Sequence, residues 1–104
     1  MSVAALFDEE YYLQTNNLVQ AAVLKGQFAS GFEHFFLYGG KELRAPNALF
    51  NPQYYLLQNP DVLRAINSGD FTNVFEHYQL FGEAENRSPS MDFIGFDSET
   101  YLSL

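Results

Sequence analysis

Residues 50–62 read FNPQYYLLQNPDV, and this stretch decides the fold class. It contains two Asn-Pro pairs, Asn51-Pro52 and Asn59-Pro60, separated by an aromatic and apolar run. Asparagine is a favoured N-cap residue and proline is favoured at the first helical position, so each pair predicts the start of a helix. We therefore place two short helices near residues 51–58 and 60–67.

A third helix is predicted near residues 71–81. Apolar side chains recur there at helical period, which indicates one stripe that faces the core. Gly69 and Gly82 stand where left-handed C-terminal caps would end helices. The residues of the stripe are Phe71, Val74, Phe75, Tyr78 and Phe81.

The same pattern occurs 43 residues earlier in the chain. At this offset 17 of 43 positions are identical without a gap, which predicts a duplicated unit. Repeat 1 spans 7–49, repeat 2 spans 50–95, and a restart at Phe96 predicts a partial repeat over 96–104. The identical pairs are Phe7/Phe50, Tyr11/Tyr54, Tyr12/Tyr55, Leu13/Leu56, Asn16/Asn59, Val19/Val62, Ala22/Ala65, Gly26/Gly69, Phe28/Phe71, Phe32/Phe75, Glu33/Glu76, His34/His77, Leu37/Leu80, Gly39/Gly82, Glu42/Glu85, Arg44/Arg87 and Pro46/Pro89.

The expected fold is all-α. Two tandem three-helix repeats of about 43 residues and the terminal partial repeat should stack into one compact domain over residues 1–104. Repeat 1 has Asn17-Leu18 where repeat 2 has Pro60-Asp61. Because the separating proline is missing, we expect the first two helices of repeat 1 to run on without a clean break.

Composition disfavours some classes of partner and chemistry. Thirteen acidic against five basic residues give a net charge of −8, which would repel a phosphate backbone and an anionic membrane surface. No run reaches the roughly 18 apolar residues that a membrane span needs, so we expect no membrane insertion. The absence of cysteine rules out a disulfide, a thiolate metal site and a cysteine nucleophile.

The two histidines, His34 and His77, occupy equivalent places in the two repeats. Neither has a second histidine four residues on, so the spacing of a helical zinc site is missing. We expect each to be structural, bonded to a backbone carbonyl or a tyrosine hydroxyl, and we expect no metal and no cofactor. The alternative is a small-ligand or metal carrier that uses His34, His77 and nearby tyrosines.

Two further sets of residues are candidates for partner contact or for ordering a loop. Glu42 with Arg44, and Glu85 with Arg87, follow the third helix of each repeat; the arginine could bond free carbonyls at the helix end while the acid holds its guanidinium. In each of the adjacent pairs Tyr11-Tyr12 and Tyr54-Tyr55, the two tyrosines cannot both face inward, because neighbouring helical residues point about 100° apart. From these pairs we name Tyr12 and Tyr55 as candidates for contact with a partner.

The motifs of repeat 2 resemble a helical repeat of bacterial proteins. They are Tyr54-Tyr55-Leu56, Asn59-Pro60-Asp61-Val62, His77-Tyr78 and Glu85-x-Arg87-x-Pro89. Similar repeats occur in secreted calcium-binding proteins of the RTX type and beside some bacterial glycosyltransferase domains. The resemblance implies an accessory module and carries over no catalytic residue. The Gly-Gly-x-Gly-x-Asp motif that binds calcium in RTX proteins is absent, so calcium binding is not carried over.

The sequence thus predicts a non-enzymatic module for protein or carbohydrate interaction. An acid-base pair would break the repeat symmetry, and no such pair stands out. We expect an accessory or scaffold part of a bacterial secreted or surface system, with a cytoplasmic location left open. Homo-oligomers through the repeat ends are a further expectation. Residues 92–104 also resemble the C-terminal signals of type I secretion.

Overall fold

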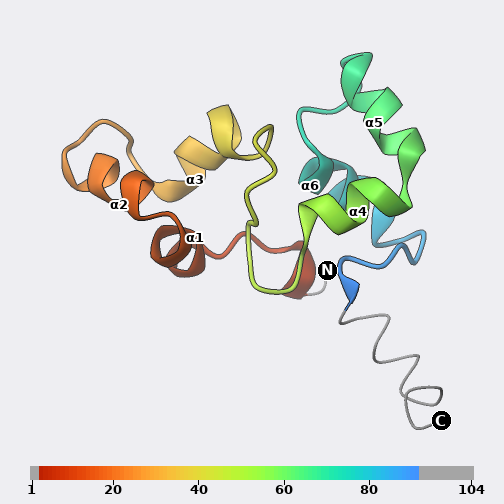
Figure 1. The fold of residues 1–104 in the computed structure, drawn as a ribbon, viewed down its shortest axis with the longest axis horizontal. Helices are drawn as coiled ribbons and strands as arrows, with labels where there is room; N and C mark the ends of the chain where they lie inside the picture. Colours follow the sequence, from red (N-terminus) through yellow and green to blue (C-terminus); the bar gives the residue numbers. More distant parts are fainter. Residues whose placement is uncertain (1–2, 92–104) are drawn as a thin grey trace, which may run out of the picture.

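The computed structural model describes residues 3–91, and within them the chain forms short helices and no strand (Figure 1). The all-α prediction is confirmed for this part of the chain. The predicted partial repeat over 96–104 and the export signal in 92–104 lie outside the described residues. The elements are η1 (Val3–Ala5), a 3-10 turn; the α-helices α1 (Glu9–Thr15), α2 (Asn17–Leu24), α3 (Gly31–His34), α4 (Pro52–Gln58), α5 (Pro60–Asn67) and α6 (Val74–His77); and the π-helical turns η2 (Phe35–Gly39) and η3 (Tyr78–Gly82).

The helices form two groups, α1 to α3 and α4 to α6, with the loop after η2 running between them (Figure 1). Within each group, all three α-helices contact one another. Each half of the chain also closes on itself. The Asp8 amide donates to the Pro46 carbonyl at 2.9 Å, and 43 residues later the Asn51 amide donates to the Pro89 carbonyl at 2.8 Å.

A single buried cluster draws on both halves. The Phe35 and Phe75 rings meet edge to face across the halves, 5.8 Å apart. Asn47 donates to the carbonyls of Ala4 and Leu6, which ties η1 to the loop before α4. Burial of large aromatics supplies much of the apolar stabilisation that such short helices need. The cluster contains Ala4, Ala5, Tyr12, Val19, Phe35, Phe50, Tyr55, Val62, Val74, Phe75 and Tyr78.

The third helix of the second half begins later than the predicted 71–81. Its N-cap is Asn73, whose side chain accepts from the Glu76 amide, while the Glu76 carboxylate accepts from the Thr72 amide at 2.7 Å. These two bonds resemble a capping box, except that Glu76 bonds the amide of the residue before the N-cap, and they fix the start of α6 at Val74. The helix continues as η3, and Phe81 is half exposed there, so its predicted place in the core is wrong.

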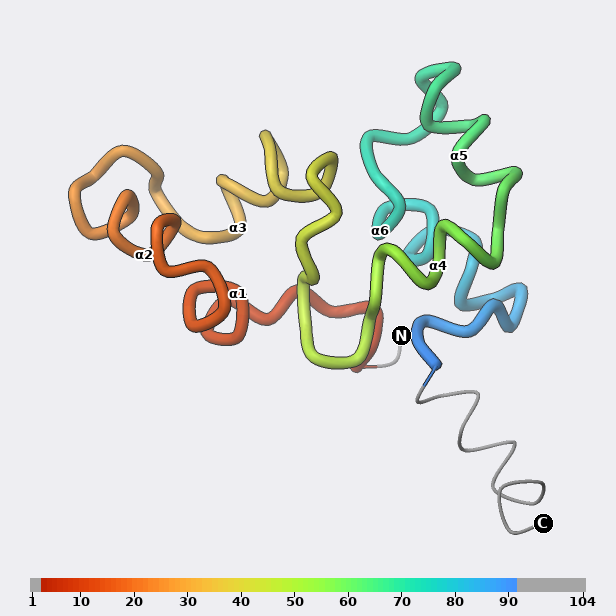
Figure 2. The backbone as a smooth tube through the Cα atoms, in the orientation of Figure 1, coloured from red at the N-terminus to blue at the C-terminus, as the bar shows by residue number. Residues whose placement is uncertain are grey.

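The break between the first two helices is present in both halves (Figure 2). The expectation that α1 and α2 would run on is therefore wrong. Asn16 and Asn59 adopt the same non-helical backbone, with φ of −133° and −132°. The Asn16 side chain donates to the Tyr12 carbonyl and accepts from Arg44, which holds the break without a proline. Asn59 makes the equivalent bonds. The prediction that its side chain caps α5 is wrong.

The two predicted cap glycines have different roles. Gly69 has φ of +89° and is left-handed, as expected, whereas Gly82 lies inside η3. The left-handed residues after the π-helical turns are Leu43 and Asn86, with φ of 61° and 60°. Gly82 is needed for space, because a Cβ there would overlap the Tyr55 hydroxyl.

We expect Gly82→Ala to lower the free energy of unfolding by about 1–3 kcal/mol, because the added methyl group overpacks a closed site. Urea titration of the variant measures this. A cycle with Tyr55→Phe, which removes the overlapping oxygen, should show that the double variant is less destabilised than the sum of the two single variants. Additive losses would contradict a steric origin.

Candidate functional site

In each half a tyrosine and a histidine form a buried pair. The Tyr12 hydroxyl and His34 Nδ1 are 2.8 Å apart, and the Tyr55 hydroxyl and His77 Nδ1 are also 2.8 Å apart. A tyrosine hydroxyl is one of the two histidine partners that the sequence led us to expect. Each histidine also meets a phenylalanine ring edge to face, with ring centres 5.0 Å apart.

Burial keeps both members of each pair neutral. It lowers the pKa of His34 and His77, with a smaller lowering from the nearby arginine, and it raises the pKa of Tyr12 to about 12. The pKa of Tyr55 is raised further for the same reason. A neutral, buried pair whose two groups are held by packing is suited to a structural role. Tyr12 and Tyr55 are fully buried, so their predicted contact with a partner is wrong.

The Glu-x-Arg residues fasten a loop to the break between helices. Arg44 bonds Glu42 at 2.8 Å and Asn16 at 2.6 Å; Arg87 likewise bonds Glu85 and Asn59. The predicted bond between each glutamate and its arginine is present. However, the second partner of each arginine is the asparagine side chain at the break, where the sequence had suggested a carbonyl at the helix end.

Arg87 has one partner that Arg44 lacks. It holds both carboxylate oxygens of Asp61, at 3.1 and 3.0 Å, whereas the equivalent position in the first half is Leu18. The bond to Arg87 lowers the pKa of Asp61, and the bond to Asp61 raises that of Arg87. These groups therefore remain an ion pair across the physiological range of pH.

The described part of the chain contains no cluster of side chains suited to bind a metal ion. No three His, Asp or Glu side chains among residues 3–91 gather closely enough to hold an ion. The two histidines stand in separate pairs, and each has Nδ1 engaged by a tyrosine.

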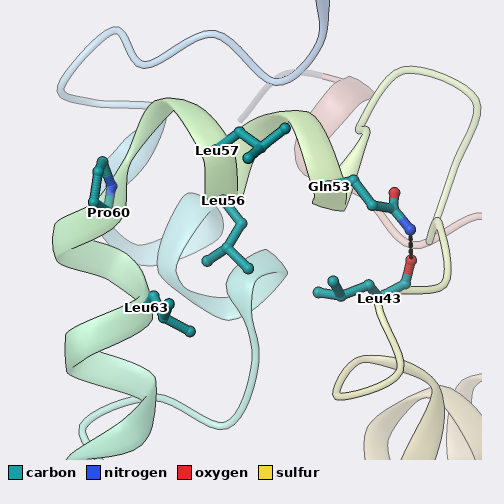
Figure 3. Close-up of a pocket in the computed structure, with 6 residues that line it drawn as sticks. All are labelled: Leu43, Gln53, Leu56, Leu57, Pro60 and Leu63. Atoms are coloured by element: carbon teal, nitrogen blue, oxygen red, sulfur yellow. Dashed lines mark hydrogen bonds between the residues drawn. The ribbon is translucent and has the colours of Figure 1, made fainter.

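An apolar groove lies between α4, α5 and the loop after η2 (Figure 3). Leu43 faces Leu56 and Leu63 across it, and its volume is about 470 Å³. Gln53 is the one amide side chain in the lining, and it already donates to the Leu43 carbonyl at 3.0 Å. The groove is lined by Leu43, Gln53, Leu56, Leu57, Pro60 and Leu63.

A second section of about 260 Å³ shares Leu43, Leu56 and Leu63 with the groove and extends it toward α6. Leu57 is 79% and Leu63 is 45% exposed, so the lining remains open to solvent. Together the two sections, which we call the leucine groove, form an open apolar surface at the junction of the two halves. Apolar surface of this kind marks binding sites in soluble proteins.

Sequence reasoning missed the leucine groove, because it weighed the positions that are identical between the repeats. The signal lay in the positions that differ. Leu57 and Leu63 correspond to Gln14 and Gln20 in the first half, so the first half lacks these two groove leucines.

Other apolar side chains are exposed on the first half. Leu18 and Leu24 of α2 are 88% and 82% exposed, where the second half has Asp61 and Asn67. Neither of these leucines lines the leucine groove. None of the helices between residues 3 and 91 has the length and apolar character that crossing a membrane requires.

No protein-family model matches the chain, and neither a curated protein nor a solved structure matches it.

We expect Tyr55→Phe to lower the free energy of unfolding by about 1–3 kcal/mol, because it leaves the buried Nδ1 of His77 without its partner. The neighbouring Tyr54→Phe is the matched control and should change stability by less than about 0.5 kcal/mol. Thermal or urea unfolding of both variants provides the comparison, and equal effects would contradict a structural role for the pair.

Stability should also depend on pH through the histidines. Burial holds their pKa in the folded protein below the ordinary value of 6.5, so the unfolded chain takes up protons first as the pH falls. The free energy of unfolding should therefore be at its maximum above about pH 7 and decline as the pH falls below about 6.5. The double variant His34→Gln/His77→Gln should flatten this decline in urea titrations. An unchanged slope in the double variant would assign it to other groups.

Proposed function

We propose that this protein is a non-enzymatic interaction module that binds an apolar segment of a partner protein in the leucine groove. The observation that carries the proposal is the lining itself, which joins leucines from both halves into one open surface. Docking a partner would remove Leu57 and Leu63 from water, and each buried leucine contributes about 1.5–3 kcal/mol.

The lining favours a protein segment over a carbohydrate. A sugar presents hydroxyl groups, and each one buried without a hydrogen bond would cost about 1–3 kcal/mol. The main section of the groove offers mostly leucine and proline side chains, and the amide of Gln53 is engaged by Leu43. Apolar side chains of a peptide have no such requirement.

The backbone of Leu43 supports the same proposal. It is left-handed, with φ of 61°, a conformation that costs a leucine about 1 kcal/mol and suits glycine or asparagine better. Asparagine does stand at the equivalent position, Asn86. A strained residue whose side chain lines a groove is consistent with a binding role.

The resemblance to the helical repeat of bacterial RTX-type and glycosyltransferase proteins supports a proposal about the system in which the module works. We place the module in a bacterial secreted or surface system, where it would serve as an accessory or scaffold part. The carrier alternative through His34 and His77 is weaker, because Nδ1 of both rings is engaged within the protein.

The test is an NMR titration of the leucine methyl groups of the whole chain. The probe is a helical peptide of about 15 residues with one leucine stripe and glutamine elsewhere. We expect shifts at Leu56, Leu57 and Leu63, and at least a roughly tenfold loss of affinity in Leu57→Asp.

The first half supplies the matched control. Gln14→Asp places the same charge at the position equivalent to Leu57 and should leave peptide affinity unchanged. Shifts confined to other surfaces, or a response to a soluble oligosaccharide in place of the peptide, would contradict the proposal.

A further inference from the structure

Resting on the leucine groove proposed above, we infer that its partner is an acidic amphipathic segment, with leucine-like side chains on one side and carboxylates beside them.

Two basic residues lie at the groove although the chain is strongly acidic. Lys41 lines its inner section, and Arg64 follows Pro60 by four residues on α5, which places it on the same side of that helix. Among the acidic residues in 3–91, none lines either section of the groove. In a chain of net charge −8, this is a local reversal of sign.

These two cations are also free to pair. The salt bridges of residues 3–91 use Arg44 and Arg87, with Glu42, Glu85 and Asp61 as partners. Lys41 and Arg64 have no ion pair within that range. Carboxylates of a docked segment would therefore meet cations that no other group has neutralised, and docking would partly shield those pairs from water.

Charge disfavours helix α2 of a second copy of this chain as the occupant. The most exposed leucines within residues 3–91, Leu18 and Leu24, lie on α2, and Lys25 follows directly after that helix. Seating α2 in the groove would bring Lys25 toward Lys41 and Arg64, and like charges brought together in an interface disfavour it.

The experiment compares three matched helical peptides with the same leucine stripe, flanked by glutamate, glutamine or lysine. Fluorescence anisotropy with the whole chain should rank their affinities in that order, with about a five- to twentyfold span from glutamate to lysine at low salt. The span should shrink at about 0.5 M salt, because exposed charges are screened. Lys41→Glu/Arg64→Glu should invert the order, and Lys25→Glu, away from the groove, should preserve it.

The outcomes separate this inference from the proposed function. Equal affinities of the three peptides would overturn the acidic partner while leaving the groove as a binding site. Failure of every peptide to bind would overturn both. Concentration-dependent dimers in sedimentation that Leu57→Asp abolishes would make a second copy the occupant and overturn the inference as well.

Discussion

A buried tyrosine that ends on a histidine nitrogen organises each half of this molecule. The Tyr55 side chain spans from α4 to His77 on α6, and its hydroxyl also lies against Gly82 in η3. The length of one side chain thus sets the spacing of three elements. Because both groups are buried and neutral, breaking the bond leaves a polar atom unsatisfied, and this makes the arrangement specific as well as stable.

Sequence reasoning recovered those parts of the fold that are decided locally. Asn51 does cap α4, since an N-cap bonds an amide three residues away and its signal is contiguous. The break at Asn16 escaped it because Arg44, 28 residues on, helps to hold that asparagine. The role of Gly82 escaped it for the same reason: the group that demands a glycine is a distant tyrosine hydroxyl.

The site was harder to predict than the fold, because a binding surface leaves no periodic pattern. Several positions that are identical in the two halves build each half, such as the tyrosine-histidine pair and the arginine that holds the break. The leucine groove arose where the halves diverge, and its wall includes Leu43 from the other half. Only the folded arrangement brings that loop against α4 and α5 (Figure 3).

The closure of each half on itself has a consequence for growth of the chain by whole units. The bonds from Asp8 to Pro46 and from Asn51 to Pro89 bring the entrance and exit of each half together. A unit whose ends meet can be inserted or removed with little disturbance to the hydrogen bonds inside its neighbours. Each added junction would create a fresh lining of its own, so that length and binding specificity could be engineered separately, one module at a time.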